Sequence, residues 1–352
     1  MTSVNNRQKE FDLIIADSDT ALFTAAQFVE ESYVLVTSNT TGTSKEFKNV
    51  STFRGTSTKQ AGGWLKEMNE FIGLTLIRDD FEIQELTRLR PDITDHLAQA
   101  EKYFSYYVGS LKNLGLAKDY RLAIGGEGNF RYDVAKIKPY KGLRKEKPII
   151  FTELKDKVLS QYKSKILLAN DSESDDTLGI LGAQNQAVYR KTGQYKYLLV
   201  YLDKDIKQVW GPTLFLNKKD LGVVFIEPFD AAKHFAYQCL KGDVTDNILG
   251  IPDLAPETRL EYGLRKTKGC GEVASESILR GSKDVPEMFT KVCKAYKEYY
   301  KEDITLPCGL VYSWKDFLRE NALLLWMQRT KDQRFDIFTD LLDKIGVDYD
   351  NF

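Results

Sequence analysis

Residues 11–19 read FDLIIADSD, a short apolar run that ends in two acids. A continuous run of this kind is typical of a strand buried on both faces of a parallel sheet. Three more segments have the same character: YRLAIGG at 120–126, KILLAN at 165–170 and KYLLVYL at 196–202. Helical patterns separate these runs, including one over 20–30 and one that begins at Asp175. The sequence therefore predicts an α/β fold with a mainly parallel central sheet flanked by helices, in which ligands bind beyond the carboxyl ends of the strands.

The other segments predict an insertion into this core and a helical region after it. Alternation around a Thr-Gly turn predicts a β-hairpin over 32–50, followed by a helix near 61–71 and a strand over 81–89. From residue 229 onward the pattern is helical, with helices expected over 229–241, 272–280, 286–300, 314–329 and 333–344. We therefore expect an α/β core over 1–228, with an insertion over about 31–115 and a basic segment over about 129–165, and then a helical region over 229–352.

Composition narrows the class of protein. The 352 residues are 42% hydrophobic, enough for a substantial core, and 50 basic residues against 51 acidic ones give a net charge of −1. Global charge thus gives no argument for nucleic-acid binding, and only local clusters can supply one. The four cysteines form no CxxC pair and are predicted to be ordinary thiols in a reducing compartment. The chain starts without signal-peptide character and has no membrane-length apolar run, so we expect a soluble cytoplasmic protein.

Acidic residues gather in four short clusters, each beside a predicted strand end or helix start. They are Asp17 and Asp19; Glu173, Asp175 and Asp176; Asp203 and Asp205; and Asp243 and Asp246. A single cluster of this kind is more often a helix cap or a turn. Four of them at one edge of a sheet are costly unless cations neutralise them, and we expect about seven of these nine acids to converge. Oxygen ligands without His or Cys suit Mg²⁺ or Mn²⁺ and indicate phosphate chemistry, while His96 and His234 lie outside every cluster and are predicted to be structural.

The densest basic segment of the chain is RYDVAKIKPYKGLRKEK, residues 131–147. Seven basic side chains stand there against two acids, together with Tyr132 and Tyr140 as stacking surfaces. Phosphate attraction and aromatic stacking suit single strands or frayed ends, while the alternative is a solvated loop. The lysines at 291, 294, 297 and 301 share one helix face, for which simple solvation is the preferred interpretation over a DNA-facing role.

These motifs, in this order, resemble those of the metal-dependent 5′ nucleases, a family that includes flap endonucleases and bacteriophage 5′-to-3′ exonucleases. Glu173-Ser-Asp175-Asp176 resembles the Glu-Ala-Asp-Asp motif of the family, and Asp203-Lys-Asp205 resembles its second Asp-x-Asp pair. GDVTDNILGIP, residues 242–252, is similar to the family's Gly-Asp-x-x-Asp-Asn-Ile-x-Gly signature. Arg131 followed by YKGLR at 140–144 resembles the basic arch segment. The resemblance extends over most of residues 11–282 and implies a PIN-like nuclease core.

The resemblance also implies roles for particular residues. Asp17, Glu173 and Asp175 would hold one Mg²⁺ or Mn²⁺ ion, and Asp203, Asp205 and Asp243 a second, with Asp176 and Asp246 in the ligand or water shell. Lys141 and Arg144 would contact the scissile phosphate, and Arg131 and Tyr140 would contact DNA. KGCGEVASESIL, residues 268–279, resembles the hairpin of a duplex-gripping helix–turn–helix element. Its expected DNA contacts are Lys266, Lys268, Gly269 and Gly271, and a K⁺ ion is an expected ligand of this hairpin.

One position departs from the family pattern. The family commonly has an Asp at the end of the strand before the arch, where this chain has Gly125. Either Asp19 or Glu127 would have to replace that acid, and Asp19 does so only if it shares a face with Asp17 rather than capping the next helix.

The function expected from the motifs is a two-metal phosphodiesterase, acting as a 5′-to-3′ exonuclease or structure-specific 5′ nuclease. Its substrate would be DNA with a 5′ end, flap or nick, or RNA primers in RNA–DNA hybrids, during phage replication in the host cytoplasm. We expect a monomer without membrane partners. The alternatives are a nuclease that acts mainly on RNA and a catalytically weak nucleic-acid-binding protein that retains the fold.

Overall fold

The structure, a computed structural model, describes residues 10–55, 63–202, 205–264 and 269–351. The chain forms two compact units: residues 1–20, 109–146 and 162–352 make the first, and residues 21–108 and 147–161 make the second. This division differs from the predicted boundary at 228, because the helices after that residue pack in the same unit as the sheet. For example, Gln208 in η3 (Asp205–Gln208) donates a hydrogen bond to Gln238 of α8 (Pro228–Lys241) at 2.7 Å.

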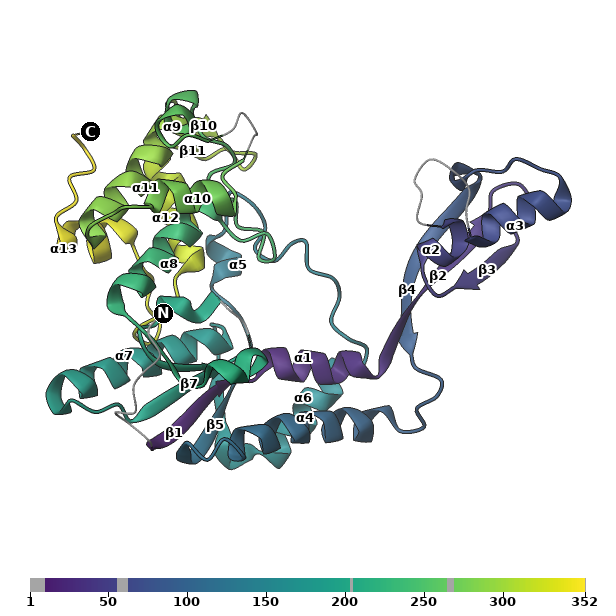
Figure 1. The fold of residues 1–352 in the computed structure, drawn as a ribbon, viewed down its shortest axis with the longest axis horizontal. Coiled ribbons are helices and arrows are strands. Elements are labelled where there is room, and N and C mark those ends of the chain that lie inside the picture. Colours follow the sequence, from purple (N-terminus) through teal and green to yellow (C-terminus); the bar gives the residue numbers. More distant parts are fainter. Residues whose placement is uncertain (1–9, 56–62, 203–204, 265–268, 352) are drawn as a thin grey trace. The chain divides into compact units, whose positions relative to one another are not determined.

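A six-stranded sheet forms the centre of the first unit (Figure 1). Its strands, in spatial order, are β6 (Ile166–Ala169), β5 (Ala117–Gly125), β1 (Phe11–Asp17), β7 (Tyr197–Tyr201), β8 (Gly211–Phe215) and β9 (Val224–Ile226). All neighbouring pairs are parallel except β8 and β9, which are antiparallel. The predicted α/β fold with a mainly parallel sheet flanked by helices is therefore confirmed, with β8 and β9 as two strands that the sequence patterns did not indicate.

Helix α7 (Ser174–Thr192) packs across this sheet and contacts β1 and β5 through β8. The shared core includes Ile15, Leu178, Leu199 and Tyr201, all nearly inaccessible to solvent. This packing fixes the start of α7 at the carboxyl ends of the strands, where the sequence places its acids.

A second core lies among the helices of the same unit. These are α8, α9 (Pro256–Glu261), α10 (Glu272–Leu279), α11 (Val285–Tyr299), α12 (Trp314–Leu325), η5 (Phe338–Leu342) and α13 (Asp343–Ile345), with a small hairpin of β10 (Ile304–Thr305) and β11 (Val311–Tyr312). Phe235, Phe289, Tyr296 and Leu318 are among the buried residues that join them. The helix predicted over 314–329 ends at Leu325, and that predicted over 333–344 begins only at Phe338.

The second unit contains the insertion. The predicted hairpin is β2 (Glu30–Ser38) with β3 (Ser44–Phe47), and β4 (Phe81–Leu89) completes an antiparallel sheet in the order β3-β2-β4. Helices α2 (Val50–Arg54) and α3 (Gly63–Ile72) close its small core around Phe53 and Leu65. Most of α1 (Asp19–Phe28) and α4 (His96–Lys112), and all of α6 (Phe151–Gln161), belong to this unit. In the part of the chain that the structure describes, no helix is long and apolar enough to cross a membrane.

Candidate active site

Asp17 ends β1 and lies against the start of α7. It is 8% exposed, and its Oδ1 accepts a hydrogen bond from the Ser174 hydroxyl at 2.9 Å. Ser174 is the first residue of α7, so this bond ties the strand end to the helix that carries Glu173, Asp175 and Asp176. The structure thus brings the first two predicted acidic clusters together.

Asp175 lies in this cluster with one of its carboxylate oxygens buried and unpartnered. Its Oδ1 is inaccessible to solvent and has no hydrogen-bond partner. Burial, followed by the neighbouring charges of Asp176 and Glu173, raises the pKa of Asp175 well above its ordinary value. A buried carboxylate oxygen without a donor is the kind of atom that a bound cation satisfies.

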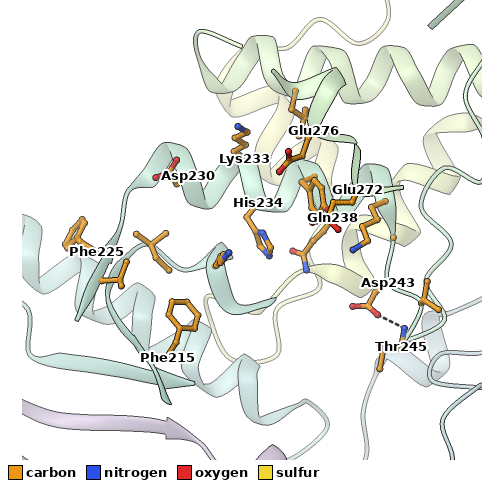
Figure 2. Close-up of a pocket in the computed structure, with 18 residues that line it drawn as sticks. Phe215, Phe225, Asp230, Lys233, His234, Gln238, Asp243, Thr245, Glu272 and Glu276 are labelled. Atoms are coloured by element: carbon orange, nitrogen blue, oxygen red, sulfur yellow. Dashed lines mark hydrogen bonds between the residues drawn. The ribbon is translucent and has the colours of Figure 1, made fainter. Parts of the chain in front are cut away.

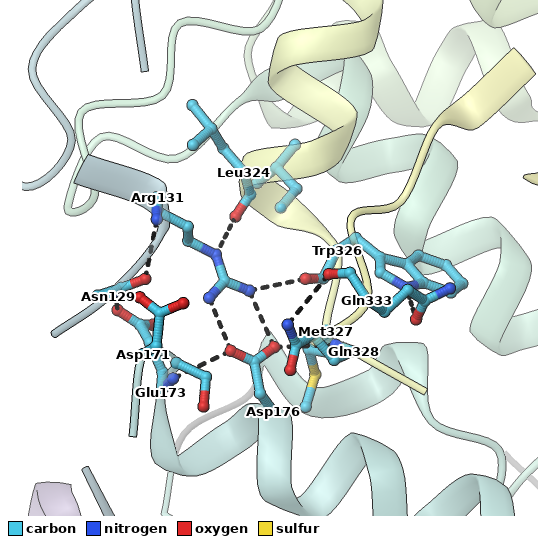
Figure 3. Close-up of polar contacts among 12 residues, drawn as sticks. Asn129, Arg131, Asp171, Glu173, Asp176, Leu324, Trp326, Met327, Gln328 and Gln333 are labelled. Atoms are coloured by element: carbon cyan, nitrogen blue, oxygen red, sulfur yellow. Dashed lines mark hydrogen bonds and ion pairs between the residues drawn. The ribbon is translucent and has the colours of Figure 1, made fainter. Parts of the chain in front are cut away.

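Asp176 has a different environment, because Arg131 binds it (Figure 3). The guanidinium donates to its two oxygens at 2.7 and 2.9 Å, and the side chains of both residues are almost completely buried. The N–H groups of Glu173 and Gln328 also donate to Asp176, at 3.0 and 2.9 Å. Burial alone would raise the pKa of Asp176, but Arg131 outweighs it and the pKa lies below its ordinary value.

These contacts correct the predicted DNA contact of Arg131 and give Asp176 a structural role. Arg131 donates its remaining hydrogen bonds to the carbonyl oxygens of Leu324 and Trp326, at 2.9 and 2.7 Å, so it has no accessible group for DNA. Asp176 has four donors on its two oxygens and anchors Arg131. Together the pair attaches the first turn of α7 to the segment that follows α12 (Figure 3).

The loop from Gly242 to Gly250 presents Asp243 and Asp246. Its end glycines have φ angles of 70° and 61°, and a Cβ on Gly242 would lie 2.6 Å from the backbone nitrogen of Gly250. Larger residues would force the two ends of the loop apart. Inside the loop, Asp243 Oδ1 accepts hydrogen bonds from the N–H groups of Thr245 and Asp246, at 2.7 and 3.1 Å. The glycine spacing of this motif therefore has a structural cause.

The basic segment docks onto this loop. The Lys141 N–H donates to the Asp246 carbonyl at 2.8 Å, and the Asn247 side chain donates to the Pro139 carbonyl at 2.9 Å. Lys141 has a φ of 57°, a left-handed conformation that these contacts must hold in place. The conformation of residues 139–144 is thus set by the acidic loop.

Tyr140 lies between two acidic clusters. Its hydroxyl is 3.1 Å from Glu173 Oε1 and 2.9 Å from Asp246 Oδ2. Burial and the charge of Glu173 raise the pKa of Tyr140 well above its ordinary value, so the hydroxyl remains a hydrogen-bond donor. The ring is buried in the helical core and packs edge-on against Tyr132, which corrects its predicted role as a DNA-stacking surface.

Lys141 and Arg144 bind the same two acids. The Lys141 ammonium pairs with Glu173, and the Arg144 guanidinium pairs with Asp246. Asn129 adds a hydrogen bond to Glu173 at 2.7 Å. The structure therefore brings the predicted phosphate-contacting residues to the acidic clusters, although the chain segments that carry them are far apart in sequence.

The space at Gly125 is occupied by Asp19. Both carboxylate oxygens of Asp19 accept from the Gly125 N–H, at 3.0 and 3.1 Å. A Cβ on Gly125 would lie 2.9 Å from Asp19 Oδ2, so the Asp19 carboxylate stands where a side chain at 125 would begin. Helix α1 begins at Asp19, yet its side chain reaches the end of β5, whereas Glu127 is exposed.

Other predicted residues are less completely placed. Asp203, Lys266 and Lys268 lie outside the described residues, and Asp205 begins η3 shortly after β7. The Gly269 N–H, expected to face a phosphate, donates instead to Asp253 Oδ1 at 3.1 Å. Gly271 precedes α10, with open space where its side chain would be.

The donor chemistry of the site fits Mg²⁺ or Mn²⁺, since all its acids offer oxygen and Asp175 has a buried oxygen without a partner. Among the described residues, however, no three His, Cys, Asp or Glu side chains are close enough to enclose an ion. Asp203, a predicted metal ligand, lies outside the described residues, so this statement does not cover it.

Several residues that bind the acids of this site were not indicated by any sequence pattern. Ser174 and Asn129 bind Asp17 and Glu173 through side chains that form no recognisable motif. Residues 324–328 contribute mainly backbone groups, and backbone contacts leave no signal in a sequence.

Comparisons with known proteins add the following. No protein-family model matches the chain, and no curated protein matches it. Among solved structures, it is similar to a bacteriophage T5 flap endonuclease pseudo-enzyme–product complex with DNA and metal ions, with 12% identity and a TM-score of 0.38 over 95% of this chain and 96% of that one. A bacteriophage T5 5′-exonuclease mutant matches with 10% identity and a TM-score of 0.36 over 81% and 88%. These proteins are of the kind that the motifs resemble, but at this level of similarity no activity transfers from them to this chain.

Proposed function

We propose that this protein is a divalent-metal-dependent nuclease that hydrolyses phosphodiester bonds of DNA. The main support is the meeting of Tyr140, Lys141 and Arg144 with Glu173 and Asp246. Cationic side chains held directly against an acidic cluster are the two halves of a phosphoryl-transfer site: acids for metal ions, and cations for phosphate.

By the resemblance of the motifs, Asp17, Glu173 and Asp175 would hold one ion, and Asp203, Asp205 and Asp243 a second, with Asp246 beside them. The three acids of the first set do not enclose an ion as they stand, so they would have to draw together around it. Bound Mg²⁺ or Mn²⁺ supplies a water of lowered pKa and stabilises charge on the phosphate. Asp17 is fixed for this role by Ser174, and Asp175 by its place in the first turn of α7. Tyr140 keeps its proton and would share this single O–H between Glu173 and Asp246, which draws the two acids towards one point.

Lys141 and Arg144 would exchange their acidic partners for the oxygens of the scissile phosphate. Arg144 is suited to this exchange because nearly half of its side chain is exposed. Lys141 is more enclosed, with 14% of its side chain exposed, so it would act at the reacting phosphate itself. Both residues would stabilise negative charge that increases in the transition state.

We further propose that the nuclease is a 5′-to-3′ exonuclease or structure-specific 5′ nuclease of a phage replication system. This proposal rests on the resemblance of the motifs and on Gly271, which lies at the start of α10 with open space beside it. A hairpin that grips the duplex backbone would place a 5′ end or flap at the acids.

Cleavage of end-labelled DNA tests this proposal. Duplex, nicked, flap and RNA–DNA hybrid substrates labelled at either end should be cut in Mg²⁺ or Mn²⁺ and remain intact in EDTA, with products that identify the 5′ end as the starting point. Binding of DNA without cleavage in either metal would favour the alternative of a binding protein that retains the fold.

Neutralising Lys141 and Arg144 together is expected to lower the cleavage rate at saturating substrate by about 100–1,000-fold, because they would act mainly on the transition state. Duplex affinity should change much less. Neutralising the matched pair Lys266 and Lys268 should instead weaken binding and reduce the slope of log affinity against log salt by about 0.9 for each phosphate that is no longer bound. Equal effects of the two pairs on rate and on affinity would contradict this division.

Exchanging the acid between positions 19 and 125 tests whether Asp19 serves the metal site. Asp19→Ala is expected to raise the Mg²⁺ concentration for half-maximal cleavage by about 10-fold or more, because a carboxylate beside the ions is removed. Gly125→Asp in that background should restore part of the affinity, since the space is then vacant. In the wild-type background Gly125→Asp should instead raise the Mg²⁺ requirement, because its Cβ would lie 2.9 Å from Asp19 Oδ2 and displace that carboxylate.

The control for this exchange is Asp12→Asn, an acid of β1 that pairs with Lys118. Its Mg²⁺ requirement should equal that of the wild type. An unchanged requirement in Asp19→Ala would leave Asp19 with only its backbone contact to Gly125.

A further inference from the structure

A cavity of about 420 Å³ opens between α8, the β8–β9 edge and the loop that carries Asp243 (Figure 2). Helix α8 lines it with Asp230, Lys233, His234, Tyr237 and Lys241, a spacing that places all five on one helical face. The opposite face of α8, including Phe235 and Cys239, is buried in the helical core. The helical core therefore fixes α8, and with it this side of the cavity wall.

The cavity adjoins the proposed active site. Asp243 and Thr245 belong to its wall, and Asp243 is also in the set of acids proposed for the second ion. Lys207, also on the wall, lies in η3, which Asp205 begins. A nucleotide whose phosphate lies at these acids would have the cavity within reach.

The chemistry of the wall favours a base over a phosphate. Four aromatic rings contribute to it, from Phe215, Phe225, His234 and Tyr237. Its charges nearly cancel, with three lysines (207, 233 and 241) against four acids (230, 243, 272 and 276). A phosphate would gain little from such a balance, whereas a flat uncharged base can stack on the rings and form hydrogen bonds with the polar groups.

The size of the cavity limits what can enter. Small-molecule sites commonly measure about 300–1,000 Å³, and this cavity lies near the lower end. It therefore suits one base with its sugar rather than a base pair. His234 and Tyr237 are held with their rings at 20° to each other, a nearly parallel pair on the wall.

We propose that this cavity receives one unpaired nucleobase of the strand being cut, next to the scissile phosphodiester. The inference rests on the proposed nuclease function and specifies its substrate as DNA with an unpaired nucleotide at the site. Stacking would draw that nucleotide out of the duplex and fix the position of the bond to be cut.

Two measurements test the proposal. The first places 2-aminopurine at single positions around the cleavage site and follows its fluorescence on binding in EDTA, where the DNA stays intact. One position should be quenched by stacking. The second replaces each nucleotide in turn by an abasic residue, and loss of the base at the same position should lower cleavage at limiting substrate by about 10-fold.

Tyr237→Leu removes the ring and leaves a smaller apolar side chain. It should abolish the quenching and reduce the difference between normal and abasic substrates to less than about twofold, because the stacking contribution is already absent. Tyr237→Phe should behave as the wild type. Phe229→Leu is the matched control, an aromatic residue of α8 that is 36% exposed and not part of the cavity wall, and it should retain both effects.

The inference is overturned if no position is quenched and no abasic substitution slows cleavage, or if Tyr237→Leu keeps the full abasic penalty. Failure of the proposed function would look different, since the wild-type protein would then cut no substrate in Mg²⁺ or Mn²⁺. The fluorescence measurement in EDTA is independent of that outcome.

Discussion

Arg131→Leu is expected to lower the free energy of unfolding by about 3–5 kcal/mol, the largest stability effect predicted for a single residue of this chain. The substitution leaves the Asp176 carboxylate buried without its cation, and it also leaves the carbonyl oxygens of Leu324 and Trp326 without donors. Each of these groups is costly to bury alone. Urea unfolding in EDTA, followed by circular dichroism, measures the change.

The matched control is Arg319→Leu. Arg319 also binds two acids, Asp316 and Asp336, but its side chain is 41% exposed, so its loss should cost less than about 1 kcal/mol. Arg131→Lys keeps a positive charge but cannot span the same four acceptors, and its stability should fall between those of Arg131→Leu and the wild type. Equal stabilities of Arg131→Leu and Arg319→Leu would contradict the anchoring role.

The fold of the core could be predicted because its strands are continuous apolar runs with helical patterns between them. FDLIIAD and KYLLVYL became β1 and β7 within a residue or two. GPTLF, which forms β8, was not predicted, since a five-residue segment that contains Gly and Pro has no distinctive pattern although all its residues are buried. Its partner β9 has only three residues.

The site could be predicted only in part, because sequence identifies chemical groups but not their partners. Lys141 and Arg144 were expected at the scissile phosphate, and the pairs Lys141–Glu173 and Arg144–Asp246 were not themselves predicted. The same reasoning assigned Arg131 and Tyr140 to DNA, since a basic or aromatic residue beside a site is usually exposed. Only the fold reveals that Asp176 and the backbone after α12 surround Arg131.

Asp175→Asn is expected to abolish cleavage while making the protein more stable in EDTA. Loss of a residue that hydrogen-bonds to a metal ligand already lowers metal affinity or activity by about 10–100-fold. Loss of a ligand itself, as proposed for Asp175, should lower the cleavage rate more. The gain in stability has a separate cause. Burial, with Asp176 and Glu173 nearby, raises the pKa of Asp175, so its ionised form is unfavourable in the folded state, and a neutral amide removes that cost.

Thermal unfolding with and without Mg²⁺ separates the two effects. In EDTA the midpoint of Asp175→Asn should lie above that of the wild type, and Mg²⁺ should raise the wild-type midpoint more than the variant's, because ligand binding stabilises only the protein that binds it. Asp243→Asn is the useful comparison. Asp243 is only partly buried and accepts two backbone N–H groups in its loop, so its replacement should reduce cleavage without the gain in stability. If Asp175→Asn were no more stable in EDTA and responded to Mg²⁺ as the wild type does, Asp175 would be neither a destabilising charge nor a metal ligand, and the first ion would have to be assigned to other residues.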